Sequence, residues 1–153
     1  MTQADCPFCK IARGEISPAK VLEDDVCVAF LDIGPLSEGH LLLIPKAHAE
    51  QIDDLPADQA GAMLAHLPAL TRALRQVTGC EGVNILQNNG RVAQQAVMHV
   101  HFHLIPRRAG DEFHFNWPAR NYSPGRAAEL AGQIRQAMGG PAGSDLGSQT
   151  NGA

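Results

Sequence analysis

The chain has 153 residues, of which 44% are hydrophobic and 18% are charged. This is enough for one compact domain with a real core and too little for two ordinary domains. The 16 acidic residues outnumber the 12 lysines and arginines, so the net charge is −4. This balance disfavours a general binder of DNA or RNA polymers, which would usually carry a basic patch.

The sequence shows no sign of membrane insertion or secretion. No apolar run approaches the roughly 18 residues that would cross a bilayer. Residues 1–8 lack the basic region and the following apolar stretch of a secretory signal. We therefore expect a cytoplasmic protein that binds no membrane and keeps its cysteines reduced.

The first third of the chain predicts short elements joined by turns. Residues 6–12 predict a helical turn, and residues 33–39, rich in Gly, Pro and Ser, predict a loop. Apolar runs bounded by turn residues predict three strands, over residues 20–23, 26–31 and 40–44. The pair Asp24-Asp25 predicts a tight turn between the first two of these strands.

The remainder of the chain predicts two helices and two strands. In the helix over residues 56–78, apolar residues recur at spacings of three and four and form one face. Pro68 interrupts this pattern and predicts a kink or an early break, and Gly79 ends the helix. The other elements are a strand over 82–87, a strand within 94–106 and a final helix over 124–138.

About five strands joined by short turns, together with two main helices, indicate an α+β fold built on an antiparallel sheet. We place a single domain over residues 1–138. Residues 139–153 are Gly, Ser and polar, and we expect this tail to be disordered.

Three histidines alternate with apolar residues in the strand within 94–106. On a strand, His99, His101 and His103 share one face, and the intervening apolar residues point to the core. Imidazole serves as a nucleophile, a general acid or base, or a metal ligand near neutral pH. The pattern alone leaves three possibilities open: a catalytic zinc site, a nucleophilic histidine with two supporting neighbours, and an exposed polar face.

The chain resembles the histidine triad (HIT) superfamily of nucleotide hydrolases and transferases. The resemblance runs from Cys6 to the final helix and is closest to the bacterial branch with an N-terminal Cys-x-x-Cys. Besides the histidines, it rests on five segments in the family's order: Cys6-Pro-Phe-Cys-Lys-Ile, Phe30-Leu-Asp-Ile, Gly39-His-Leu-Leu-Leu-Ile-Pro-Lys, Gln87-Asn-Asn-Gly and Ile105-Pro-Arg. It implies the HIT-like fold, with one long and one C-terminal helix, and a homodimer. The apolar face of helix 56–78 and the C-terminal segment are the expected dimer surfaces.

The resemblance implies a purine nucleotide substrate cleaved at its α-phosphate. The leaving group would be that of a phosphoramidate, an adenylate or a dinucleoside polyphosphate. His101 would attack and form a nucleotidyl-histidine intermediate that water hydrolyses, His103 would donate to the phosphate, and His99 would orient His101 or bind metal. The implied nucleotide-binding residues, in addition to His101 and His103, are Asp32, Ile33, His40, Asn88 and Gln95.

Two positions depart from the family's pattern. Gln94 stands where the family commonly has a glycine, so its side chain must point away from the phosphate or the loop must shift. Ala96 stands where one branch has a serine that assists the leaving group. Efficient phosphoramidase activity of that branch's kind is therefore in question.

A pair of cysteines near the N-terminus suggests metal binding. Cys6-x-x-Cys9 alone is a weak signal that also suits redox motifs. The resembling branch supplies two more ligands at positions that here are His48 and His99. Four protein ligands leave no open position, so the resemblance implies a structural zinc ion. The alternative is two free thiols on a short helix.

Two rival functions remain at this point. One is a metal-dependent hydrolase in which all three alternating histidines bind a catalytic zinc ion. The other is a nucleotide-binding interaction module without turnover. Elsewhere, Cys27 in an apolar run is expected to be part of the core, and His66 on the long helix is expected to be a bystander.

Overall fold

The computed structural model describes residues 3–114 and 116–139. The chain divides into two compact units, residues 1–114 and residues 115–153, and each is described by itself. The predicted disordered tail falls almost entirely on residues 140–153, which lie outside the described residues. The boundary of a single domain at residue 138 stays a prediction.

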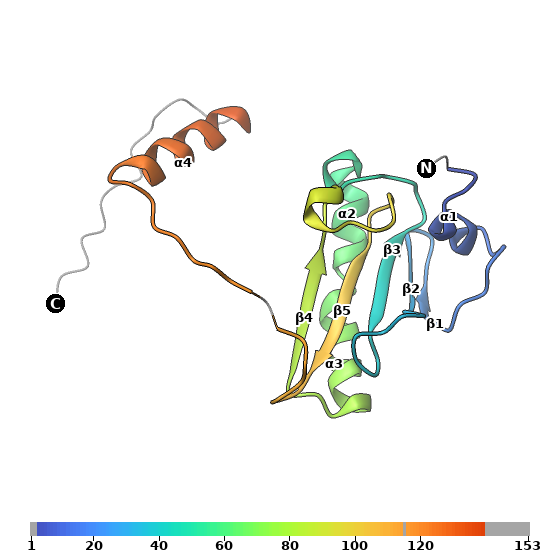
Figure 1. The fold of residues 1–153 in the computed structure, drawn as a ribbon. Coiled ribbons are helices and arrows are strands. Elements are labelled where there is room, and N and C mark those ends of the chain that lie inside the picture. The colour runs from blue at the N-terminus through green and yellow to red at the C-terminus, as the bar shows by residue number, and fades with distance from the viewer. Residues whose placement is uncertain (1–2, 115, 140–153) are drawn as a thin grey trace. The chain divides into compact units, whose positions relative to one another are not determined.

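The first unit is built on an antiparallel sheet of five strands in the order β1-β2-β3-β5-β4 (Figure 1). The strands are β1 (Lys20–Glu23), β2 (Cys27–Leu31), β3 (Leu41–Pro45), β4 (Gly82–Gln87) and β5 (Phe102–Arg107). Asp24 shapes the β1–β2 turn, because its Oδ1 accepts hydrogen bonds from the backbone N–H groups of Val26 and Cys27 at 2.8 and 2.7 Å. The predicted α+β fold with a five-stranded antiparallel sheet is confirmed.

The helix predicted over 56–78 is interrupted, as the proline indicated. The two parts are α2 (Ala57–Leu64) and α3 (Leu67–Thr78), and Pro68 lies in the first turn of α3, where a missing N–H costs no hydrogen bond. Gly79 ends α3 in the left-handed conformation, with φ of 65°. Short 3₁₀ turns lie at η1 (Ile52–Asp54) and η2 (Arg91–Ala93).

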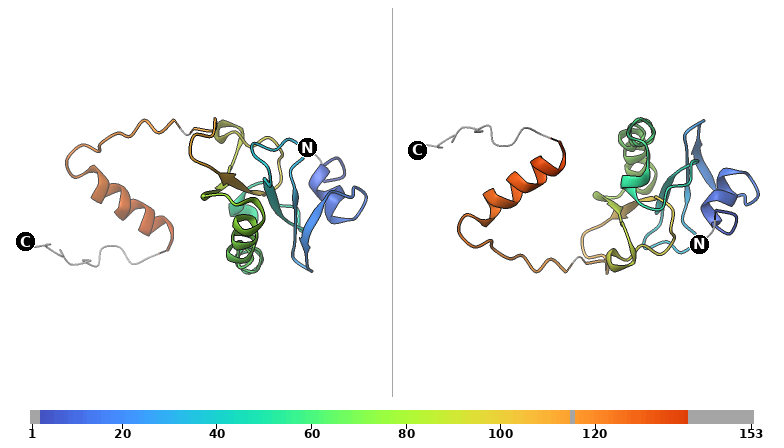
Figure 2. Two further views of the ribbon diagram at one scale, coloured as in Figure 1. Left: turned by 90° about the horizontal axis from the view of Figure 1, so that it is seen from below. Right: turned by 90° about the horizontal axis from the view of Figure 1, so that it is seen from above.

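Helices cover both faces of the sheet (Figure 2). Alternate residues of β2 point to opposite sides, so Cys27 and Ala29 join one core cluster while Val28 and Phe30 join the other. The first cluster lies under α2 and α3, and the second lies under the short helix α1 (Pro7–Ala12). Met63, Leu70 and Leu74 of α2 and α3 are therefore buried in the protomer, whereas Val77 of α3 is exposed, and a dimer surface on these helices stays a prediction.

The strand that contains the end of the histidine motif begins later than predicted. β5 begins at Phe102, so only His103 of the three histidines lies on it. His99 and His101 lie in the preceding irregular segment, where the backbone N–H of Val100 donates to the carbonyl of Ala49 at 2.8 Å. The alternation nevertheless holds, because Val100, Phe102 and Leu104 pack in or against the cluster under α2 and α3.

The second unit contains helix α4 (Arg126–Ala137), close to the predicted 124–138. None of its residues is buried, and Ile134 on its apolar face is 58% exposed. Among the described residues, no helix combines the length and hydropathy that crossing a membrane requires.

Candidate functional site

His101 and His103 line a cleft of about 460 Å³ on the α1 side of the sheet. Leu42 of β3 pairs with His103 of β5, which fixes the position of His103 on the sheet. The ring of His101 lies beside the ring of His103, with 4.9 Å between their centroids. Two adjacent imidazoles therefore face a space large enough for a ligand.

The hydrogen bonding of His101 fixes its tautomer. Its Nδ1 lies 2.7 Å from the backbone carbonyl oxygen of His99, and a carbonyl oxygen can only accept. Nδ1 therefore carries the proton, and Nε2 of the neutral ring keeps its lone pair. Burial lowers the pKa of His101 below the usual imidazole value, so the ring is neutral at pH 7. A neutral imidazole with a free Nε2 is a nucleophile.

A chain of hydrogen bonds fixes the tautomer of His103. The backbone N–H of Leu36 donates to Nδ1 of His40 at 3.1 Å, so the proton of neutral His40 is on Nε2. That Nε2–H donates to Nδ1 of His103 at 2.9 Å, which leaves the proton of His103 on its Nε2. Burial lowers the pKa of His103 to about 4, so it is neutral at pH 7 and offers one N–H.

Two of the expected nucleotide-binding residues, Asp32 and Ile33, also line the cleft. Asp32 Oδ1 accepts a hydrogen bond from the N–H of Gly34 at 2.9 Å, and Ile33 is 99% exposed. Ile33 is therefore not a core residue. His40 is buried and supports His103, as described above.

Asn88 and Gln95 occupy different positions. Asn88 is half-buried after β4 and is not part of the cleft lining. Gln95 is buried, and its amide bonds inward: Oε1 accepts from the N–H of Gly90, and Nε2 donates to the carbonyls of Glu50 and Val97. This side chain shapes the loop before the histidines, and direct contact of either residue with a nucleotide stays a prediction.

The apolar wall of the cleft was not foreseen from the sequence. It consists of side chains from α1, the following loop, β2, β3 and the histidine loop: Phe8, Ile11, Ile16, Pro18, Phe30, Leu42 and Val97. Phe8 lies between the two cysteines, and its ring contacts those of His99 and His101 at centroid distances of 5.8 and 5.2 Å. In the sequence, the apolar residues beside the cysteine motif were the signal that could have indicated this wall.

The backbone accommodates Gln94 at the position where the family commonly has a glycine. Gln94 is exposed and has φ of 68°, the left-handed conformation that glycine adopts without strain. The loop therefore keeps the backbone shape of a glycine-containing loop, and the side chain extends into solvent. Ala96, the second departure, lines the cleft and offers no hydroxyl.

We expect Gln94→Gly to raise the free energy of unfolding by about 0.5–1 kcal/mol. The substitution removes the left-handed strain of a residue with a Cβ, and the added freedom of the unfolded chain offsets part of the gain. Urea unfolding monitored by circular dichroism measures the change. Ala93→Gly, one position earlier in η2, is the matched control and should destabilise. A destabilising Gln94→Gly would show that the glutamine side chain makes a favourable contact.

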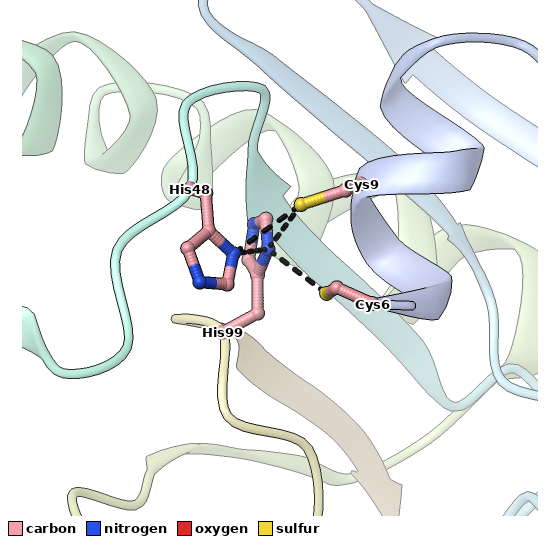
Figure 3. Close-up of side chains that lie close together, drawn as sticks. All are labelled: Cys6, Cys9, His48 and His99. Carbon is pink, nitrogen blue, oxygen red and sulfur yellow. Dashed lines mark hydrogen bonds between the residues drawn. The ribbon is translucent and has the colours of Figure 1, made fainter. Parts of the chain in front are cut away.

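Four side chains gather next to the cleft as a candidate metal centre (Figure 3). Cys6 and Cys9 extend from the α1 region, His48 follows β3, and His99 precedes β5. Nδ1 of His99 lies 3.4 Å from the sulfur of Cys6, 3.5 Å from that of Cys9 and 3.2 Å from Nδ1 of His48. The sequence prediction brought together these same four residues.

The donor set fits zinc. Two sulfurs and two imidazole nitrogens make a closed tetrahedral site. Nε2 of His99 lies 3.0 Å from the carbonyl oxygen of Pro45 and must donate to it, so Nδ1 presents its lone pair to the cluster. Burial raises the pKa of the Cys9 thiol to about 11, a cost that a bound cation would offset.

The triad histidines thus divide between two sites. His99 faces the two cysteines, whereas His101 and His103 face the cleft. A single catalytic zinc held by all three would require His99 to leave the cysteines and His101 to break its bond to the carbonyl of His99. The geometry therefore opposes the metal-dependent hydrolase that the motif had left open.

Comparison with known sequences places these features in one family. Residues 13–110 match the HIT domain model. The chain is 38% identical over 144 residues to the adenosine 5'-monophosphoramidase HNT1 of Candida albicans, covering 90% of this chain and 93% of that protein. It is 44% identical over 109 residues to the adenylylsulfatase HINT3 of Arabidopsis thaliana, covering 71% of this chain but only 55% of that longer protein.

Solved structures share the fold. A HIT family protein from Bacillus subtilis superposes with a TM-score of 0.82 at 38% identity, covering 86% of this chain and 96% of that one. A zinc-bound histidine triad family protein from Mycobacterium smegmatis superposes with a TM-score of 0.69 at 34% identity, covering 89% and 99%. By sequence, fold and the arrangement of its histidines, this chain belongs to the HIT family, whose curated members named above are hydrolases.

Proposed function

We propose that this protein hydrolyses purine nucleoside phosphoramidates or related α-phosphate derivatives through a nucleotidyl-His101 intermediate. The observation that carries the proposal is the tautomer of His101, whose Nδ1–H is bound to the carbonyl of His99 and whose Nε2 is free beside the cleft. The names of the yeast phosphoramidase and the plant adenylylsulfatase support an adenosine nucleotide as substrate. Trapping a nucleotidyl adduct on His101 and locating it by mass spectrometry tests the proposal.

The reaction follows from the two tautomers. His101 Nε2 attacks the α-phosphorus, the nitrogen–phosphorus bond forms, and the bond to the leaving group breaks. The leaving group takes up a proton from solvent, while Nε2–H of His103 donates to a phosphate oxygen as charge develops. Water then attacks the same phosphorus and gives up a proton to solvent as the nitrogen–phosphorus bond breaks, which releases the nucleoside monophosphate and restores neutral His101. The apolar wall around Phe8 and Phe30 would hold the base.

We expect the acid limb of the pH profile of kcat/KM to be centred below the ordinary imidazole pKa of about 6.5. Burial lowers the pKa of His101, so the nucleophile remains neutral at pH values where an exposed imidazole is already partly protonated. Its protonation removes the lone pair and with it the reaction. A pH–rate profile of the purified protein measures this, and an acid limb centred at or above pH 7 would contradict a buried nucleophile.

A structural zinc ion on Cys6, Cys9, His48 and His99 belongs to the same proposal. Bound there, the ion would supply no open coordination position and would take no part in the transfer. These residues would join α1 to the segment before β5, and so would hold Phe8 against His101. The zinc-bound relative from M. smegmatis supports this assignment. A cytoplasmic location stays a prediction of the sequence.

We further propose that the protein is a homodimer. One surface that we propose for the dimer is the edge strand β4, which pairs only with β5 in the described part of the chain. Ile85 on this strand is 42% exposed. The C-terminal segment, where Trp117 is 82% exposed, stays the second predicted surface. Sedimentation at micromolar concentration should show a dimer, and a monomer there would refute the proposal.

A further inference from the structure

A second cluster of metal-ligating side chains lies on the opposite face of the sheet from α1. Asp24 of the β1–β2 turn, Cys27 of β2 and His66 between α2 and α3 place one ligand atom each within 4.8 Å of the others. We refer to these three residues as the turn cluster. Cys27 belongs to the core under α2 and α3, whereas the cysteines of the first candidate centre belong to the other core.

The contacts within the turn cluster converge on the carboxylate of Asp24. Nε2 of His66 lies 2.7 Å from Asp24 Oδ2, and the Cys27 thiol donates to the same carboxylate. Asp24 Oδ1 is held by the backbone N–H groups of Val26 and Cys27. The backbone therefore fixes the carboxylate, and its Oδ2 faces the imidazole.

The turn cluster is closed at one end and open at the other. Cys27 is fully buried, whereas the side chains of His66 and Asp24 are 30% and 38% exposed. Lys46 acts on the Cys27 thiol through its positive charge, and its Nζ forms an ion pair with Glu23 at 3.0 Å. An ion could enter from solvent, reach a thiolate at the base and keep one position for water.

We propose that Asp24, Cys27 and His66 form a second zinc-binding site, independent of the cysteine pair near the N-terminus. One sulfur, one imidazole nitrogen and one carboxylate oxygen are ligands that Zn²⁺ accepts in proteins, and three such ligands leave an open fourth position. With bonds of about 2.0–2.3 Å, the gap between His66 Nε2 and Asp24 Oδ2 must widen by roughly half an ångström. His66 lies in the junction between two helices, where such a movement breaks no strand pairing.

Binding has a defined proton balance. The zinc–sulfur bond forms as the Cys27 thiol loses its proton to solvent, and His66 moves its own proton to Nδ1 as Nε2 takes the metal. One thiol proton is therefore released for each ion bound. Burial raises the pKa of the Cys27 thiol to about 12, so metal binding weakens as the pH falls.

Metal titration of the full chain tests the site. The protein is first loaded with zinc to fill the proposed centre near the N-terminus, and free zinc is removed. It is then titrated with Co²⁺, which gives a sulfur-to-cobalt absorption band only where a thiolate is a ligand. We expect about one cobalt ion per chain, the absorption band, and release of about one proton per ion in weakly buffered solution.

Matched variants separate a real site from adventitious binding. His66→Gln and Cys27→Ala should each abolish the cobalt band. Cys27 is fully buried, so Cys27→Ala can impair folding, whereas His66 is half-buried and His66→Gln tests the site without that risk. Cys80→Ala, another buried thiol, and Asp25→Asn, the exposed neighbour of Asp24, should leave it unchanged. Absence of the band in the zinc-loaded wild type, or its survival in His66→Gln, would overturn the proposal. The result is independent of nucleotide turnover.

Discussion

His101→Ala is expected to lower turnover of an adenosine phosphoramidate by at least about 10³-fold. The substitution removes the atom that forms the covalent intermediate, and His103 on β5 cannot replace it, because its Nδ1 accepts from His40 and its Nε2 carries the proton. Steady-state rates and mass spectrometry of the quenched protein measure both parts of the expectation. The wild type should show a nucleotidyl adduct on the peptide containing His101, and the variant should show none.

Two controls make this result specific. His114→Ala removes an exposed imidazole outside the cleft and should leave the rate unchanged. The affinity of His101→Ala for a nucleoside monophosphate should remain close to that of the wild type, which shows that the cleft has kept its shape. Equal turnover by wild type and His101→Ala would remove the proposed mechanism. Nucleotide binding by the wild type without turnover would identify a binding module instead.

Cys9→Ser is expected to lower the zinc content by about one ion per chain and the free energy of unfolding by about 3 kcal/mol or more. Cys9 lies 3.2 Å from Nδ1 of His48, and its loss opens the closed donor set. Without the ion, α1 is held only by its packing, and the contact of Phe8 with His101 loosens. Elemental analysis and thermal unfolding measure the two effects.

Cys80→Ser provides the matched comparison for Cys9→Ser. Cys80 is also a buried free thiol but lies after α3, away from the four ligands. It should keep the wild-type zinc content and lose only about 1 kcal/mol. If both variants lose the same stability and neither loses zinc, the four side chains are a hydrogen-bonded cluster and not a metal centre.

The sequence determined much of the fold because its signals are local. The two-residue alternation around His101 predicted which side chains enter the core, and it held even where regular strand pairing ends at Phe102. Pro68 predicted the break between α2 and α3, since a proline is tolerated only in the first turn of a helix. From the sequence, we expected Gln94 either to shift its loop or to point its side chain outward. The left-handed backbone at Gln94 shows that the loop is kept and the side chain points outward.

Candidate ligands and the candidate nucleophile were also identifiable from the sequence, because Cys6, Cys9, His48, His99 and His101 stand at positions that the family's motifs mark. The roles of neighbouring residues were not identifiable in this way. Gln95 has an amide that could bind a phosphate, yet this amide already forms hydrogen bonds with the backbone of Gly90, Glu50 and Val97. A residue's hydrogen-bond partners depend on segments that are distant along the chain.

By itself, the sequence therefore determined the order of elements, the faces of the strands and the chemical groups available to the site. Only the tertiary structure decided which lone pairs are free: Nε2 of His101 because a carbonyl holds Nδ1, and Nδ1 of His99 because Pro45 holds Nε2. It also joined Asp24 and Cys27 to His66, which the sequence had left as an unrelated turn residue, a core cysteine and a bystander. Periodicity is encoded in neighbouring residues, whereas tautomers and ligand clusters arise from packing between elements far apart in the chain.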